Sequence, residues 1–117
     1  YNPGNTFEQI KSMIEEACSG AEVSIDFDHV ATAFSTPDGL FLDTVCDAIK
    51  KVTSIKTVRD TGGGTSDGRF LAAVGVPVAE LGLTNNTIHQ VNECVATHEL
   101  DTLTEIYTTI ITSFKAA

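Results

Sequence analysis

Thr61-Gly62-Gly63-Gly64-Thr65-Ser66-Asp67-Gly68-Arg69-Phe70 is the stretch that decides the fold of this 117-residue chain. It follows a short apolar run and leads into a helical pattern, so it predicts a tight turn from a strand into a helix. Three consecutive glycines allow positive φ angles and a close approach of the backbone to a ligand. The N–H groups that open the next helix are unpaired and carry the positive end of its dipole, which favours anions such as carboxylates.

Two familiar phosphate-binding motifs do not match this turn. No Gly-Lys-Ser/Thr follows the glycines, as a P-loop requires, and both the GxGxxG spacing and its acidic partner are missing. A tight connection without any ligand is the alternative interpretation. In that case Asp67 and Arg69 would only cap the helix and form a local ion pair, which contributes little on a surface.

A second polar segment, Glu80 to Glu93, places His89 in a short loop after an apolar run. A neutral imidazole in such a loop is a common metal ligand. Zinc needs three or four ligands, so a structural histidine is the alternative. Glu80 or Glu93 could orient a metal-bound imidazole, or could serve only as surface or capping residues. His29 and His98 are expected to be structural or solvated.

Apolar residues recur at helical spacing in four parts of the chain. Asn5 with Glu8 three residues later predicts a capping box for the first helix. Thr36 as cap, with Pro37 in the first helical position, predicts the start of the second. The predicted helices run from Asn5 to Ala17, from Thr36 to Val52, from Ser66 to Val74 and from Thr97 to Phe114.

The remaining apolar segments read as strands. Residues 23–27 alternate apolar and polar side chains, which is the period of a half-buried strand, and residues 30–34 form a second extended segment that could continue that strand. Short strands are also predicted at 55–58 and 76–81. Helices that alternate with strands predict an α/β architecture with right-handed crossovers. The turn residues that cluster at 35–39 predict a domain boundary.

The composition restricts the possible partners. The net charge is −9, from 16 acidic and 7 basic residues. A phosphate backbone or an anionic membrane surface would be repelled, so neither is an expected partner. No apolar run reaches the roughly 18 residues of a membrane span. A hydrophobic content of 42% is typical of a globular protein.

The three cysteines, Cys18, Cys46 and Cys94, are odd in number and widely spaced. This pattern predicts no disulfide framework and no CxxC site, and it fits free thiols in a reducing cytosol. Cys94 lies five residues from His89. Nearness in sequence does not make a nucleophile and base pair, so a Cys–His hydrolase is not expected.

The two polar segments resemble a known family. Thr61 to Phe70 is similar, without departure, to a segment of the succinyl-diaminopimelate desuccinylases, which are dinuclear zinc amidohydrolases. Glu80 to Val95 resembles a second segment of that family, with Asn85 and His89 in register. The resemblance covers nearly the whole chain, loosely before residue 36 and closely after it.

The resemblance implies roles for four residues. His89 would be a zinc ligand, Gly64 and Thr65 would contact the substrate, and Asn85 would help to shape the substrate site. The intact enzyme would bind two zinc ions, with cobalt as a possible substitute, and would be a cytoplasmic homodimer. It would cleave N-succinyl-LL-2,6-diaminopimelate to succinate and LL-2,6-diaminopimelate, in lysine and diaminopimelate biosynthesis.

The resemblance also implies that much of the enzyme lies elsewhere. The family's His-x-Asp motif, its Glu-Glu pair and its general base have no counterpart in this sequence, so no catalytic residue is expected here. Residues 1–35 resemble the end of a lid and dimerisation domain, and residues 36–117 resemble the C-terminal segment of a zinc-exopeptidase-like catalytic domain. The chain alone is therefore expected to be an inactive fragment.

Two other functions stay open at this point. A related metallo-deacylase or dipeptidase would share the metal histidine and differ in substrate. A stand-alone anion-binding module would use the glycine-rich turn without any catalysis.

Overall fold

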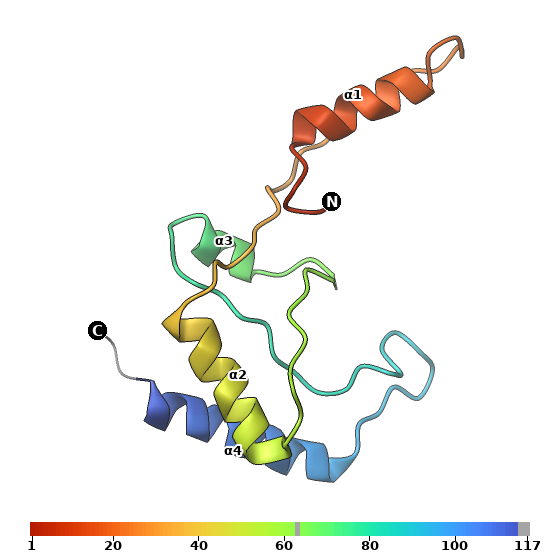
Figure 1. The fold of residues 1–117 in the computed structure, drawn as a ribbon. Coiled ribbons are helices and arrows are strands. Elements are labelled where there is room, and N and C mark those ends of the chain that lie inside the picture. The colour runs from red at the N-terminus through yellow and green to blue at the C-terminus, as the bar shows by residue number, and fades with distance from the viewer. Residues whose placement is uncertain (63, 115–117) are drawn as a thin grey trace. The chain divides into compact units, whose positions relative to one another are not determined.

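The computed structural model describes residues 1–62 and 64–114, and Gly63 of the glycine run lies outside them. Helices form at the four places that the apolar spacing predicts, although their ends differ (Figure 1). Their bounds are α1 Phe7–Ala17, α2 Leu40–Thr53, α3 Gly68–Ala72 and α4 Thr97–Ser113. Within the described part of the chain, no helix is both long enough and apolar enough to cross a bilayer.

The capping box of α1 lies one residue later than predicted. The Thr6 side chain accepts a hydrogen bond from the Gln9 N–H at 3.2 Å, and the Gln9 side chain accepts one from the Thr6 N–H at 2.8 Å. The prediction of Asn5 with Glu8 was therefore wrong. The Asn5 N–H instead bonds to the Asn2 carbonyl at 2.9 Å, which places Asn5 in the turn that precedes the helix.

Thr36 does not cap α2, which begins after Gly39. Its hydroxyl donates to the Val78 carbonyl at 2.5 Å and accepts from the Val78 N–H at 3.0 Å. The Thr36 side chain thus satisfies both the N–H and the carbonyl of Val78. The sequence had predicted that Val78 would pair with a neighbouring strand instead. Because the hydroxyl is used there, it is unavailable to α2.

The predicted strands are not present among residues 1–62 and 64–114, so the α/β architecture is not confirmed. Alternation favours an extended backbone, but a strand exists only when a second strand completes its ladder of hydrogen bonds. Several apolar side chains of these segments remain exposed instead of facing a common core. Examples are Val23, Val30, Ile55, Val58 and Val76.

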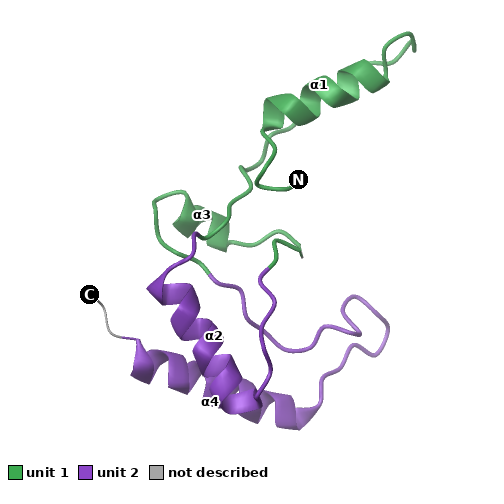
Figure 2. Ribbon diagram, in the orientation of Figure 1, with its two compact units in different colours: residues 1–36, 60–78 green, residues 37–59, 79–117 purple. Residues whose placement is uncertain are grey.

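The chain divides into two compact units (Figure 2). Unit 1 comprises Tyr1–Thr36 and Asp60–Val78, and unit 2 comprises Pro37–Arg59 and Ala79–Ala117. The first break lies within the turn cluster at 35–39. The assignment of residues 1–35 to a lid domain and of 36–117 to a catalytic domain stays a prediction.

Unit 2 is built on the packing of α2 against α4. Val45, Ile49 and Ile106 form a buried apolar cluster between these helices. Phe41 extends the packing, because its ring meets that of Phe114 edge to face at 6.0 Å between centroids. The further apolar residues packed against the cluster are Val52, Ala79, Leu81 and Ile110.

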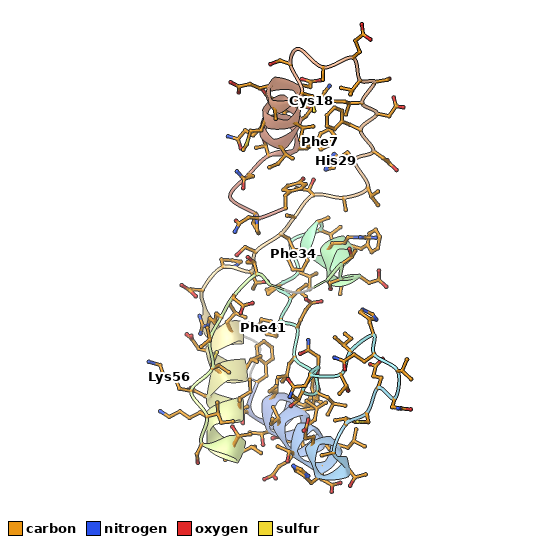
Figure 3. All side chains as sticks on the ribbon, turned by 90° about the vertical axis from the view of Figure 1, so that its right-hand side faces the viewer. Phe7, Cys18, His29, Phe34, Phe41 and Lys56 are labelled. Atoms are coloured by element: carbon orange, nitrogen blue, oxygen red, sulfur yellow. The ribbon has the colours of Figure 1, made fainter. Side chains whose placement is uncertain are left out.

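In unit 1, an aromatic cluster joins α1 to residues 27–29 (Figure 3). The Phe7 ring stacks on the imidazole of His29 with 4.4 Å between centroids, and it meets Phe27 edge to face at 6.3 Å. The Tyr1 hydroxyl and His29 Nε2 are hydrogen-bonded at 3.2 Å. His29 thus contributes to the packing of unit 1, which is one of the two roles expected for it.

Candidate functional site

The glycine-rich turn is held by hydrogen bonds on both sides of its exposed residues. The Gly62 N–H donates to the Asp60 carboxylate at 2.9 Å, and the Gly68 N–H donates to the Ser66 hydroxyl at 2.9 Å. In both bonds a backbone N–H donates to the side chain two residues earlier, which is typical of tight turns. Gly64 and Thr65 lie between them and are exposed, so a ligand could reach their backbone and side-chain groups.

The helix after the turn is shorter than predicted. It begins at Gly68 rather than near Ser66, ends at Ala72 rather than Val74, and has no side-chain cap at Asp67. Gly75, with φ of +82°, follows in the left-handed conformation. A helix of five residues has too few aligned peptides for a strong dipole, so the anion site expected from a long helix is weakened.

Gly68 is required because of its neighbours. A Cβ atom there would lie 2.7 Å from Val78 Cγ1, 3.0 Å from Ser66 Oγ and 3.5 Å from the Phe34 ring. By contrast, a Cβ at Gly64 would meet nothing within 4 Å. The last glycine of the turn therefore serves packing, while Gly64 faces open space.

The local ion pair between Asp67 and Arg69 is not found among the ion pairs of the described residues. The Arg69 guanidinium instead lies over the Phe70 ring, with Cζ 4.7 Å from the ring centroid. Its Nε atom is buried and has no hydrogen-bond partner among the described residues.

His89 lies in a loop that one threonine closes. The Thr87 hydroxyl donates to the Cys94 carbonyl at 2.9 Å and accepts from the Cys94 N–H at 3.0 Å. Inside this closure the Gln90 N–H bonds to the Thr87 carbonyl at 3.0 Å. The ends of the loop are thereby held together, and His89 is exposed between them.

The His89 backbone has a left-handed conformation, with φ of +61°. Such a conformation costs a non-glycine residue roughly 1–2 kcal/mol, although histidine adopts it more often than most residue types. Asn92 in the same loop has φ of +67°. Backbone strain of this kind concentrates at functional sites, where the surrounding structure maintains it.

Asn85, the other predicted residue of this segment, lies at the start of the same loop. Its carbonyl accepts a hydrogen bond from the Ile88 N–H at 3.1 Å, and Asn85 is exposed. Asn85 and His89 therefore belong to one ordered series of turns in unit 2. Gly64 and Thr65 belong to unit 1.

Comparison with known proteins gives a family. Residues 2–113 match the sequence profile described as Peptidase family M20/M25/M40. The chain belongs to this family.

Two curated relatives with the same name are similar to most of this chain. The chain is 45% identical over 109 residues to a succinyl-diaminopimelate desuccinylase of Pseudomonas syringae pv. syringae, which covers 92% of this chain and 29% of the relative. It is 42% identical over 118 residues to the protein of that name from Acinetobacter baumannii strain AYE, covering 99% of this chain and 31% of the relative. The chain thus spans about 30% of the length of these family members.

A complete metal site of the M20 family would need more ligands than this chain brings together. Among residues 1–62 and 64–114, no group of three or more His, Cys, Asp and Glu side chains is arranged to hold a metal ion. Glu80, Glu93 and Cys94 are exposed. The described residues therefore offer one candidate metal ligand, His89, in a loop whose ends are held together by hydrogen bonds.

Two supports of the His89 loop could not be predicted from local sequence. One is the Thr87 closure, and the other is Glu99, whose carboxylate accepts a hydrogen bond from the Thr84 N–H at 3.1 Å. Glu99 lies in the first turn of α4 and ties the start of the loop to that helix. Neither contact has a sequence signal, because the partners are seven and fifteen residues apart and follow no helical or strand period.

Proposed function

We propose that this chain is the C-terminal part of a succinyl-diaminopimelate desuccinylase. The observation that carries the proposal is identity of 42–45% to proteins of that name over nearly the whole chain. The substrate would be N-succinyl-LL-2,6-diaminopimelate, and the products would be succinate and LL-2,6-diaminopimelate. The intact enzyme would be a cytoplasmic homodimer.

His89 is proposed as a metal ligand. Membership in this peptidase family implies metal dependence, and the proposed metals are two zinc ions, with cobalt as a possible substitute. The braced loop, the exposed side chain and the left-handed backbone of His89 support the role. The other ligands and the general base would come from the part of the family's sequence that this chain does not span.

The remaining proposed roles concern the substrate. When bound, the two metal ions would polarise the amide carbonyl and lower the pKa of a water molecule. The Thr65 hydroxyl and the exposed backbone at Gly64 can donate hydrogen bonds to a carboxylate or an amide oxygen of the substrate. The Asn85 side chain can both donate and accept, so it can bind either end of an amide.

A chimeric enzyme tests the proposal. The 109 residues of the Pseudomonas syringae relative that align with this chain are replaced by the residues of this chain. We expect the chimera to release succinate from N-succinyl-LL-2,6-diaminopimelate when loaded with zinc, and we expect the 117-residue chain alone to release none.

Either of two results would contradict the proposal. A folded, metal-loaded chimera without desuccinylase activity would remove the assigned substrate. Zinc-dependent activity of the chain alone would show that it contains a complete site.

A dipeptidase or related deacylase is the second candidate, because the matching family is described as a peptidase family. The same chimera, assayed with dipeptides and N-acetyl amino acids, separates the two. A preference for those substrates over the succinylated diamine would favour the second candidate.

A further inference from the structure

Arg59 is the last residue before the segment that contains the glycine-rich turn, and its side chain makes three polar contacts. Its Nη2 donates to Asp43 Oδ1 at 2.8 Å, and its Nη1 donates to Asp38 Oδ1 at 2.5 Å. Its Nε donates to Cys46 Sγ at 3.3 Å. All three partners come from α2 or the residues just before it, so the guanidinium clasps the start of that helix.

The residues just before Arg59 have little else to hold them. Ile55 is 62% exposed and Val58 is 85% exposed, and of residues 55–58 only Thr57 is half-buried, so burial contributes little to fixing this segment. The Ile55 N–H bonds to the Thr53 hydroxyl at 3.1 Å, which ties only its beginning to α2. The end of the segment is therefore held mainly through the Arg59 side chain.

The contacts of Arg59 with Asp38, Asp43 and Cys46 are better suited to orienting the chain than to stabilising the fold. Asp38 and Asp43 are 90% and 62% exposed, and exposed ion pairs contribute little to the free energy of unfolding. The planar guanidinium, however, fixes the orientation of the Arg59 side chain relative to α2, because its N–H donors have a rigid geometry. The buried cluster of Val45, Ile49 and Ile106 does not include Arg59, so the core of unit 2 does not depend on it.

We infer that Arg59 is a positioning residue, which anchors the chain entering the glycine-rich turn to the start of α2. Asp60 follows directly, and its carboxylate already shapes the turn through the Gly62 N–H. Fixing Arg59 therefore fixes the point at which the chain enters the turn, next to Asp60. The consequence for catalysis rests on the proposed function, since Gly64 and Thr65 are its proposed substrate contacts.

The test is hydrogen exchange of the 117-residue chain, read at the backbone amide of Gly62, which is hydrogen-bonded to the Asp60 carboxylate. Arg59→Gln removes the positive charge and the paired Nη donors of the guanidinium, and Asp43→Asn removes one ion pair. For both variants we expect exchange at Gly62 to become at least ~3-fold faster, because local opening is governed by such weak local contacts. Arg59→Lys should restore part of the protection, since one charged contact can re-form.

Asp47→Asn is the matched control. Asp47 is an exposed carboxylate on the same helix, and it is not among the ion-pair partners of the described residues. Its loss changes the net charge as Asp43→Asn does, but the turn should exchange at the parent rate. The amides of α4 report on the fold and should be unchanged in every variant.

Two outcomes would overturn the inference. One is a turn that exchanges at the parent rate in Arg59→Gln. The other is faster exchange throughout α2 and α4, which would make Arg59 a general stabiliser of unit 2. Because the readout requires no substrate, failure of the proposed function would leave this result interpretable.

Discussion

His89 combines an exposed imidazole with a left-handed backbone, φ +61°, in a loop closed by its own neighbours. A free loop would relax to an unstrained conformation, so the surrounding hydrogen bonds must maintain this one. The loop thus holds the His89 backbone in one conformation, and the proposed metal-binding role is tested by removing the imidazole.

His89→Ala in the chimeric enzyme should lose one metal ion and nearly all activity. A first ligand contributes more than the outer partners, whose loss already costs about 10–100-fold, so we expect a fall in kcat/KM of at least ~100-fold. Metal content by mass spectrometry and succinate release together check this result.

His98→Ala is the control for that experiment. His98 is an exposed histidine in the first turn of α4, outside the closed loop, so its variant should keep both metal and activity. Full metal occupancy with normal turnover in His89→Ala would remove His89 from the site.

Gly68→Ala should destabilise the packing between α3 and Val78. The new Cβ would lie 2.7 Å from Val78 Cγ1, too close for any real contact, so the Val78 side chain or the backbone must shift. Overpacking of this kind costs typically about 1–3 kcal/mol. Hydrogen exchange at α3 should rise accordingly, whereas Gly64→Ala, which adds a Cβ in open space, should leave α3 protected.

At the scale of single elements, α1 depends on its capping box. Thr6→Ala removes the acceptor for the Gln9 N–H, and such a loss costs about 1 kcal/mol of helix stability. The fraction of helix at residues 7–17, followed by NMR chemical shifts, should fall. Asn5→Ala should leave the fraction of helix unchanged. An equal fall in Asn5→Ala would mean that Asn5 is the N-cap, as the sequence predicted.

The His89 loop depends on Thr87 in the same way. Thr87→Val keeps the shape of the side chain but removes both bonds to Cys94, each worth about 0.5–1.5 kcal/mol. We expect faster exchange across residues 87–94 and weaker metal binding by the chimera.

Thr108→Val is the matched control for the loop variant. The Thr108 hydroxyl bonds only to the Thr104 carbonyl one turn earlier in α4, a contact that does not stabilise a helix. Loop exchange at the parent rate in Thr87→Val would mean that the turn bonds inside the loop suffice to hold it.

These elements also show what the sequence can and cannot predict. Helices were predicted where they form, because one amphipathic face is a property of a single segment. Strands were not, because alternation at 23–27 or 76–81 specifies no partner with which to pair. His89 could be singled out by residue type and position, whereas the contacts of Thr87, Glu99 and Arg59 depend on distant chain and left no pattern to read.

At the scale of the whole molecule, burial is concentrated in unit 2. The buried apolar residues of the described chain are Val45, Ala48, Ile49 and Ile106, and all four lie in α2 or α4. In unit 1, α1 has no buried residue and is held by aromatic contacts at its surface. Resistance to unfolding should therefore be centred on the α2–α4 pair.

Ile106→Ala is the sharpest test of that distribution. Ile106 is 5% exposed and is the member of the buried cluster that α4 contributes. Removing it costs about 2–5 kcal/mol, a large share of the 5–15 kcal/mol that usually separates folded from unfolded chains. Urea denaturation followed by circular dichroism should show a greatly lowered midpoint, or helix loss without denaturant.

Two further variants keep that test informative. Ile106→Val removes a single methylene and should cost only about 0.5–1.5 kcal/mol, so its transition stays measurable even if the alanine variant is unfolded. Ile111→Ala truncates a side chain that is 74% exposed on the same helix and should change stability by less than about 0.5 kcal/mol. Equal losses at positions 106 and 111 would mean that α4 is stabilised by its helix propensity and not by its contact with α2.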